Sequence, residues 1–229
     1  MINLLVLLSN DLSLETAAPE VANSLSFWEL AVKGGIIMIP ILLLSIIGVY
    51  IFFERYYTIR RSTKEDPYFM DKIKDYIHAG QIEYAQVLCQ QTDNIIARMI
   101  EKGISRIGRP LNDINAAIDN VANLEVAKLE KGLPTLGTIA GVAPMLGFLG
   151  TVIGMIRAFY DMANAGSNID VQLLSNGIYT AMVTTVAGLA VGIVAYFCYN
   201  ILVARIERVV YTLQARATEF MDLLNEPVN

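Results

Sequence analysis

The chain has 229 residues, of which 55% are hydrophobic and 17% charged, and its formal net charge at pH 7 is -5. The net charge itself says little about partners, because charge is spread over several parts of the chain, and no nucleic-acid partner is expected. Its two cysteines, Cys89 and Cys198, are too few and too far apart for a disulfide framework or a metal site.

Three uncharged stretches are long enough to cross a membrane, since a helix needs about 20 apolar residues to do so. They cover 34–53, 133–156 and 171–204. At about 1.5 Å per residue the third would be about 50 Å long, so part of it must leave a hydrocarbon core of about 30 Å. The chain is therefore predicted to be an all-α membrane protein. Its transmembrane helices are expected at 34–54, 134–158 and 175–203, with a hairpin at 159–174.

Lysine and arginine are distributed unevenly along the chain. Twelve of the 17 lie between Arg55 and Lys131, and three more follow the third stretch. Because cytoplasmic segments carry this excess, 1–33 and the hairpin are predicted to be periplasmic, and 55–133 and 204–229 cytoplasmic. The opening MINLLVLL lacks the preceding positive charge of a signal peptide and is expected to form a peripheral segment.

The cytoplasmic part is predicted to be helical throughout. Helices are expected at 66–80, with Asp66 as N-cap, at 81–91 and at 94–107. A longer helix from Leu111 is predicted to continue into the second membrane helix through a bend at Pro134. In the tail an apolar stripe recurs with helical spacing. It consists of Ile206, Val209, Val210, Leu213, Ala217, Phe220, Met221 and Leu224. Two membrane helices are thus predicted to extend into the cytoplasm and to pack with a cytoplasmic helical domain.

No catalytic pattern is present in the sequence. It contains neither GxxxxGK[ST] nor HExxH, and its one histidine, His78, lies near the predicted end of a helix, where a solvated or capping role is typical. An enzyme is not expected, and no catalytic residue, cofactor or metal site is predicted.

Small residues recur at spacing four in the second and third stretches. Such pairs let helix backbones approach closely where lipid gives no hydrophobic drive. The glycines expected to pack helices are Gly137, Gly141, Gly147, Gly150, Gly154, Gly188 and Gly192. A single pair could arise by chance. Three glycine pairs in two neighbouring stretches are less easily explained by chance. The spacing of four continues from Gly177 to Ala181 and from Ala181 to Thr185. Together these pairs favour a tightly packed, oligomeric assembly.

Threonines gather in the same two stretches. Thr151 and Thr185 each lie 17 residues from Asn168 in the hairpin, so two antiparallel helices would hold them at one depth. Thr184 is adjacent, and Thr180 lies about one turn further out. Each hydroxyl could simply bond a carbonyl of its own helix. Converging polar groups within a span can instead mark a packing contact or a polar pathway.

Two motifs carry a resemblance to a known family. The run LGFLGTVIGMIRAFYDMA at 146–163 is followed by LLSNGIYTAMVTTVAGLAVGIVAYFCYN at 173–200. In order and spacing they resemble the MotA/TolQ/ExbB proton-channel family, and most closely its ExbB/TolQ branch. The three-span topology and large cytoplasmic segment match as well, so the resemblance covers nearly the whole chain. The flagellar branch is disfavoured because it would carry a fourth span.

The resemblance implies a pentamer in the bacterial inner membrane, with the second and third helices around a pore. A single-span ExbD- or TolR-like partner would sit in that pore, and its aspartate would carry the proton. Thr151 and Thr185 fall on the family's pore-lining threonines. Thr180 departs from the pattern, because many relatives carry a glutamate there. The proton motive force would act on a TonB- or TolA-like protein, and membrane lipid would surround the ring.

The three stretches contain no Asp, Glu, His or Lys, so the proton-carrying group must come from a partner. Arg157, near an outer end, is expected to snorkel or to pair with Asp161. Alternatives to an ExbB-type subunit are a TolQ-type subunit of the Tol-Pal system and a scaffold that conducts nothing. A scaffold would tolerate alanine or valine at Thr151 and Thr185. A secondary transporter is weakened by the lack of an inverted repeat and of a charged binding group in the spans.

Overall fold

The computed structural model describes residues 34–63, 66–164 and 171–225. Within these ranges the chain forms seven helices and no strand. They are α3 (Met38–Ser62), α4 (Phe69–His78), α5 (Ile82–Gln91), α6 (Ile95–Ile104), α7 (Leu111–Glu130), α8 (Leu133–Asn164) and α9 (Val171–Asn225). The expectations for 1–33, including the peripheral segment, and for 165–170 in the hairpin lie outside the described residues.

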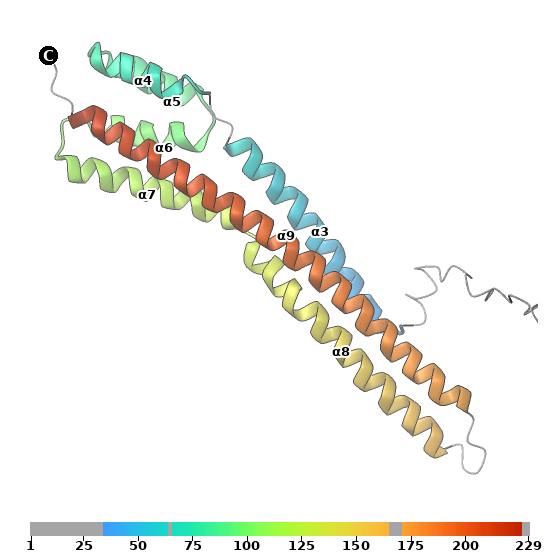
Figure 1. Cartoon of the computed structure of the whole chain (residues 1–229). Helices are drawn as coiled ribbons and strands as arrows, with labels where there is room; N and C mark the ends of the chain where they lie inside the picture. Colours follow the sequence, from blue (N-terminus) through green and yellow to red (C-terminus); the bar gives the residue numbers. More distant parts are fainter. Residues whose placement is uncertain (1–33, 64–65, 165–170, 226–229) are drawn as a thin grey trace, which may run out of the picture.

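The helices build an elongated molecule around α9, which runs along its whole length (Figure 1). Helix α8 lies antiparallel beside one half of α9, and α3 packs against both. Helices α4, α5, α6 and α7 cluster around the other half. Helix α9 therefore packs with the membrane helices along one half and with the helical bundle along the other.

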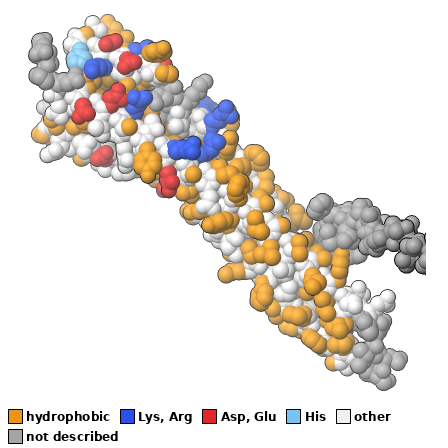
Figure 2. All heavy atoms as spheres, in the orientation of Figure 1, with side chains coloured by type: hydrophobic (Ala, Val, Ile, Leu, Met, Phe, Trp, Pro, Cys, Tyr) orange, Lys and Arg blue, Asp and Glu red, His pale blue; other side chains and the backbone are white. Residues whose placement is uncertain are grey.

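Among the described residues, three helical segments are long and apolar enough to cross a membrane: Met38–Ser62, which is α3, Leu111–Asn164, which contains α7 and α8, and Leu174–Asn225 of α9. The expectation of an all-α protein with three such helices is confirmed. Apolar side chains cover the α8 end of the rod, whereas charged ones gather around α4 to α7 (Figure 2). With 55 residues, α9 would be about 80 Å long, far more than a hydrocarbon core of about 30 Å. A large part of α9 therefore lies outside the lipid.

The predicted stripe on the tail is the face through which α9 joins the helical bundle. Ile206, Val209, Leu213 and Phe220 are buried in one core with residues of α4, α6 and α7. The ring of Phe220 lies so close to Gly103 that a Cβ there would come within 2.7 Å of it. The apolar period of the sequence thus corresponds to real burial.

The bend before α8 lies two residues earlier than predicted. Helix α7 ends at Glu130, Lys131 has an extended ψ of 126°, and Gly132 has a φ of +89°. Only glycine adopts this left-handed conformation without steric cost. Pro134 instead occupies the first turn of α8, where its missing N–H is not needed. The prediction of one continuous helix that bends at Pro134 was therefore wrong. The helix ends, and Gly132 makes the turn.

The predicted N-cap at Asp66 also acts slightly differently. Helix α4 begins at Phe69, and the Asp66 carboxylate accepts the backbone N–H of Tyr68 at 3.1 Å and the ammonium of Lys72 at 3.1 Å. Asp66 therefore closes the turn that leads into the helix. At the other end Gly80, with a φ of +71°, follows α4 as expected.

Candidate functional site

The closest contact between membrane helices is the seam of α8 and α9. A Cβ on Gly147 would lie 3.0 Å from the carbonyl oxygen of Thr184, and one on Gly188 would lie 2.5 Å from that of Ala143. Gly150, Gly154 and Gly192 face atoms of the opposite helix in the same way. These glycines let the two backbones touch directly.

Gly137 and Gly141 do not take part in this close seam, although their spacing is the same. A Cβ on Gly137 would only reach the ring of Tyr199 at 3.5 Å, and one on Gly141 would meet no atom within 4 Å. The glycines expected to indicate oligomerisation are thus mostly used within one chain. Gly141 is the exception that leaves open space.

Thr184 is buried inside the α8–α9 seam. Only 1% of its surface is exposed, and its hydroxyl donates to the carbonyl of Ala181 at 2.8 Å. Its side chain occupies the space that a Cβ on Gly150 would need. Within this chain Thr184 is therefore a packing residue and does not line an open surface.

Thr185 reaches across the seam. Its hydroxyl lies 3.2 Å from the carbonyl of Gly147 on α8 and 3.3 Å from that of Ala181 on its own helix. A hydroxyl has one proton and can donate to only one of them at a time. Thr151 donates to the carbonyl of Phe148 at 2.6 Å, within α8. Bonding to a carbonyl of the same helix is therefore seen for all three threonines, and Thr185 alone of the three adds a hydrogen bond between helices.

The hydroxyls of Thr151 and Thr185 lie along the same edge of the helix pair. Thr151 follows Gly147 by four residues, about 40° around the helix, whereas Ile139, which contacts Gly48 of α3, is about 80° to the other side. On α9, Thr185 and Val191 flank Gly188 by about 60° on opposite sides, and Val191 lies on the α3 side. This edge, called the threonine edge below, therefore faces away from α3.

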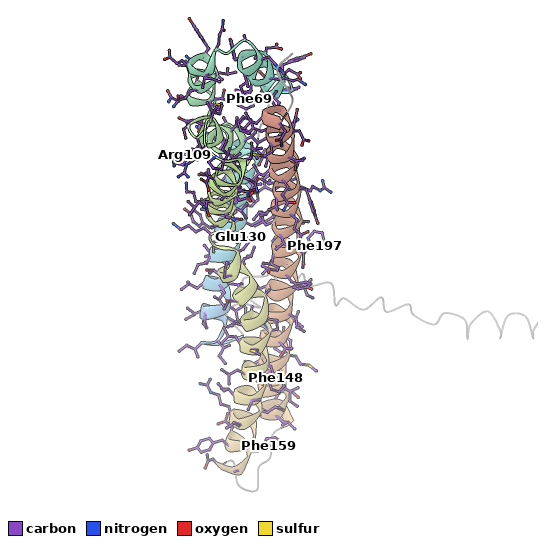
Figure 3. All side chains as sticks on the ribbon, turned by 90° about the vertical axis from the view of Figure 1, so that its left-hand side faces the viewer. Phe69, Arg109, Glu130, Phe148, Phe159 and Phe197 are labelled. Atoms are coloured by element: carbon purple, nitrogen blue, oxygen red, sulfur yellow. The ribbon has the colours of Figure 1, made fainter. Side chains whose placement is uncertain are left out.

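The two threonines also lie at similar heights along the pair. Gly147 contacts Thr185, and Gly154 contacts Ala181, so Thr151 is level with the turn of α9 that contains 181–185. Thr180 is partly buried, and with five residues of separation it points about 140° away from Thr185. Phe148 and Phe159 of α8 are exposed and lie in the half of the molecule away from the helical bundle (Figure 3).

A cavity opens further along the threonine edge, toward the helical bundle. It has a volume of about 690 Å³ and is lined by Glu130, Leu133, Tyr199, Glu207 and other residues. Leu133 precedes Thr151 by 18 residues, or about five turns, so both lie on the same face of α8. The cavity with its two carboxylates therefore lies about 27 Å from the threonine level.

An ion cluster around the buried carboxylate of Glu125 joins α6 to α7, and the sequence did not predict it. Glu125 binds Arg98 at 2.8 Å and Lys128 at 2.6 Å. Burial by itself raises the pKa of Glu125, but these hydrogen bonds outweigh it and lower the pKa below its usual 4.5. The spacing of Glu125 and Lys128 suggests an ion pair on one helix, whereas nothing local indicates Arg98, which is 27 positions away.

The other ionisable and nucleophilic side chains of the described ranges form no catalytic or metal-binding arrangement. In the described ranges no three His, Cys, Asp or Glu residues come together as metal ligands. Burial, with the nearby Glu101 carboxylate, raises the pKa of the Cys89 thiol to about 12, which keeps the thiol protonated and unreactive. No ion pair joins Arg157 to Asp161 among the residues that the structure describes.

Comparison with known proteins adds a second line of observation. Residues 91–215, more than half of the chain, match the model of the MotA/TolQ/ExbB proton channel family. The chain is 30% identical over 176 residues to a biopolymer transport protein ExbB homolog of Methanothermobacter thermautotrophicus, covering 76% of this chain and 62% of that protein. It is 33% identical over 180 residues to the biopolymer transport protein ExbB-like 1 of Synechocystis, covering 75% and 68%.

A TolQ protein is similar over a longer range. The Tol-Pal system protein TolQ of Pseudomonas aeruginosa is 25% identical over 226 residues, which covers 92% of this chain and 97% of that protein. The chain spans less than two thirds of the Methanothermobacter relative's length but nearly all of the TolQ protein's. The family model, together with three long apolar helices, shows that this multi-pass membrane chain belongs to the MotA/TolQ/ExbB proton channel family.

Proposed function

We propose that the chain is the channel and stator subunit of an ExbB–ExbD type motor. It would use the proton motive force across the bacterial inner membrane to energise TonB-dependent transport across the outer membrane. The observation that carries the proposal is the threonine edge: two hydroxyls at one level, in the stretches 133–156 and 171–204, which contain no Asp, Glu, His, Lys or Arg.

The proposed assembly is a ring, a pentamer by family resemblance, with the threonine edges of its subunits around a central pore. The open space at Gly141 supports this arrangement, because it leaves room beside the helix pair for another helix. We propose that an ExbD- or TolR-like single-span protein occupies the pore and contributes a carboxylate at the level of the threonines. The motor would pass its mechanical work to a TonB- or TolA-like protein.

The hydroxyls suit a carboxylate in either protonation state. A threonine hydroxyl donates to a carboxylate oxygen and accepts from a protonated carboxyl, but it does not itself store a proton at ordinary pH. The mobile group must therefore belong to the partner. One charge that crosses the membrane yields about 2.3 kcal/mol per 100 mV, and successive protons would turn the partner's helices from one subunit to the next.

The acidic cavity gives the proton an exit. Glu130 and Glu207 line it on the threonine edge, beyond the apolar region of α8. Carboxylates there would lower the energy of a cation leaving the pore. In the proposed orientation this end is cytoplasmic, because twelve of the 17 basic residues lie between Arg55 and Lys131.

A TolQ-type role in the Tol-Pal system is the second candidate, favoured by the similarity to TolQ over 92% of the chain. Complementation separates the two. A strain without its own ExbB and TolQ should regain siderophore-dependent growth if the chain serves TonB. It should regain detergent resistance if the chain serves TolA.

The decisive test replaces the hydroxyls while keeping the side-chain shape. Thr151→Val and Thr185→Val are co-expressed with the partner from the same genome, and the complex is checked by co-purification. Loss of a hydrogen bond to a charged group should reduce the activity that depends on the proton motive force about tenfold to a hundredfold. Thr185→Ser, which keeps the hydroxyl, is the matched control and should retain activity. Full activity of both valine variants in an intact complex would leave the non-conducting scaffold as the better explanation.

A further inference from the structure

Two hollows lie along the seam between α3 and α9, on the side of the molecule away from the threonine edge. The first has a volume of about 420 Å³ and an almost wholly apolar lining, which includes Leu44, Val49 and Phe53 of α3 and Val194 of α9. The second has a volume of about 330 Å³ and is lined by Ile59, Arg60, Thr63, Arg205, Arg208, Val209 and Thr212.

The hollows follow one another on the same face of both helices. Residues seven apart lie on nearly the same face of a helix. Phe52 of the apolar hollow and Ile59 of the basic one are such a pair on α3, as are Cys198 and Arg205 on α9. A molecule that fills the first hollow can therefore continue into the second.

The basic hollow concentrates positive charge that no carboxylate of the described residues neutralises by an ion pair. Three arginines line it, and none of them forms an ion pair with a carboxylate of the described residues. Of the described acids close to these arginines in the sequence, Glu54 pairs with Arg55, and Glu207 lines the cavity on the threonine edge. Glu65 lies outside the described residues.

One of the arginines is held in place by an aromatic ring at the junction of the two hollows. Arg205 lies 4.2 Å from the centre of the Tyr56 ring and donates to its hydroxyl at 3.0 Å. A guanidinium has five N–H donors, so most remain for another ligand. Stacking on the ring fixes its position before that ligand arrives.

We propose that this seam is a binding site for one anionic phospholipid. An acyl chain lies in the apolar hollow, and the headgroup phosphate lies among Arg60, Arg205 and Arg208. From Leu44 to Phe53 the groove runs about 14 Å along the helix, close to the half-thickness of a hydrocarbon core of about 30 Å. Tyr56 and Arg60 follow one and two turns later, at the depth of the headgroups. The lipid belongs to the leaflet on the side of the helical bundle.

The test uses the full chain in nanodiscs of phosphatidylcholine with a minor fraction of phosphatidylglycerol, released for native mass spectrometry of bound lipid. Wild type should retain one tightly bound phosphatidylglycerol per chain in preference to phosphatidylcholine. Arg60→Gln with Arg208→Gln should reduce that preference by about ten- to thirtyfold. Arg109→Gln, an exposed charge on the loop before α7, removes the same kind of charge elsewhere and should leave the preference unchanged.

A second variant tests the apolar half. Val49→Trp fills the groove while all arginines remain, and it should also displace the lipid. Equal loss in Arg109→Gln and the double variant would show a non-specific charge effect and overturn the proposal. So would unchanged binding in Val49→Trp, or competition by soluble glycerol 3-phosphate at the same concentration as the lipid, which would indicate a phosphate site without a lipid. Near-native helicity and melting temperature of each variant would exclude misfolding.

Discussion

Thr184 and Thr185 are neighbours in the sequence but occupy different environments. Thr184 faces Gly150 inside the seam and is fully enclosed, whereas Thr185 lies at its edge and touches the carbonyl of Gly147. A step of one residue turns a helix by about 100°, which is enough to separate a packing residue from an edge residue. The proposed ion path therefore uses Thr185 and Thr151, with Thr184 as support.

Glu125 is the residue whose charge should contribute most to the helical bundle. Its pKa is lowered in the folded protein, so its stabilisation is complete above the unfolded pKa near 4.5 and is lost as the pH falls through the folded value. Glu125→Gln should lower the free energy of unfolding at neutral pH by about 1–3 kcal/mol. The difference from wild type should shrink as the pH falls below the unfolded pKa. Thermal unfolding in detergent across this range measures it.

The matched control is Glu83→Gln, an exposed acid on α5. It should leave the melting temperature nearly unchanged at every pH, because exposed charges contribute little. If Glu125→Gln were as stable as wild type at neutral pH, Arg98 and Lys128 would not depend on Glu125, and the ion cluster would have no energetic role.

At the residue scale, the sequence predicts the level of a side chain along the helix pair. It does not predict whether that side chain is buried or which way it points. The spacing from Asn168 places Thr151 and Thr185 at one level, in agreement with the heights inferred from contacts of Gly147 and Gly154. Nothing in the sequence distinguishes the environment of Thr184 from that of Thr185. The Arg98–Glu125 contact depends on how α6 and α7 cross, which local pattern does not encode.

At the scale of elements, the α8–α9 pair depends on glycine where the backbones touch. Periodicity alone gives the same rank to Gly141 and Gly188, because both stand in pairs at spacing four. The contacts separate them: a Cβ on Gly188 would lie 2.5 Å from a backbone oxygen, and one on Gly141 would meet no atom within 4 Å. Whether a glycine faces a neighbour is a property of the helix pair, which one helix cannot predict.

Alanine substitutions at these two positions should therefore differ in their effect on stability. Gly188→Ala forces the helices apart and should lower stability by about 1–3 kcal/mol. Gly141→Ala adds a methyl group to open space within one chain and should leave stability equal or up to about 1 kcal/mol higher, since alanine favours the helix. Melting temperatures of the purified variants in detergent measure both. Equal destabilisation by the two would mean that the α8–α9 seam does not have the register described.

The bend between α7 and α8 shows why element boundaries were predicted less well than elements. Proline at 134 suggested a kink, but a proline in the first turn of a helix breaks nothing. Gly132, with its φ of +89°, ends one helix and lets the next begin in a new direction. The sequence holds both signals, and only the backbone shows which of them is used.

At the scale of the whole molecule, three membrane helices could be predicted because hydropathy is a local property that a window of residues reveals. The apolar stripe of the tail likewise predicted that the third membrane helix extends beyond the lipid, and α9 runs without a break for 55 residues. The structure joins the membrane pair and the helical bundle by this helix. A shift of α9 at the threonine level would therefore reach the core around Phe220 directly.

Orientation in the membrane is the prediction on which the direction of proton flow depends. The far end of α8 and the end of α9 lie at opposite ends of the molecule (Figure 1), so a label at each end reads the topology. In a variant with alanine at Cys89 and Cys198, a cysteine is placed at Asn164 or at Thr218, both of which are exposed. An impermeant maleimide should label Asn164→Cys in intact spheroplasts, because the positive-inside rule places that end in the periplasm.

Thr218→Cys should react only after the membrane is opened, since it lies beside the charged bundle that the same rule places in the cytoplasm. Equal labelling of both in intact spheroplasts would indicate leaky preparations, which a cytoplasmic marker protein detects. Labelling of Thr218→Cys alone would reverse the topology. The cavity with Glu130 and Glu207 would then open on the proton-rich side, and its acids would collect protons for the pore instead of releasing them.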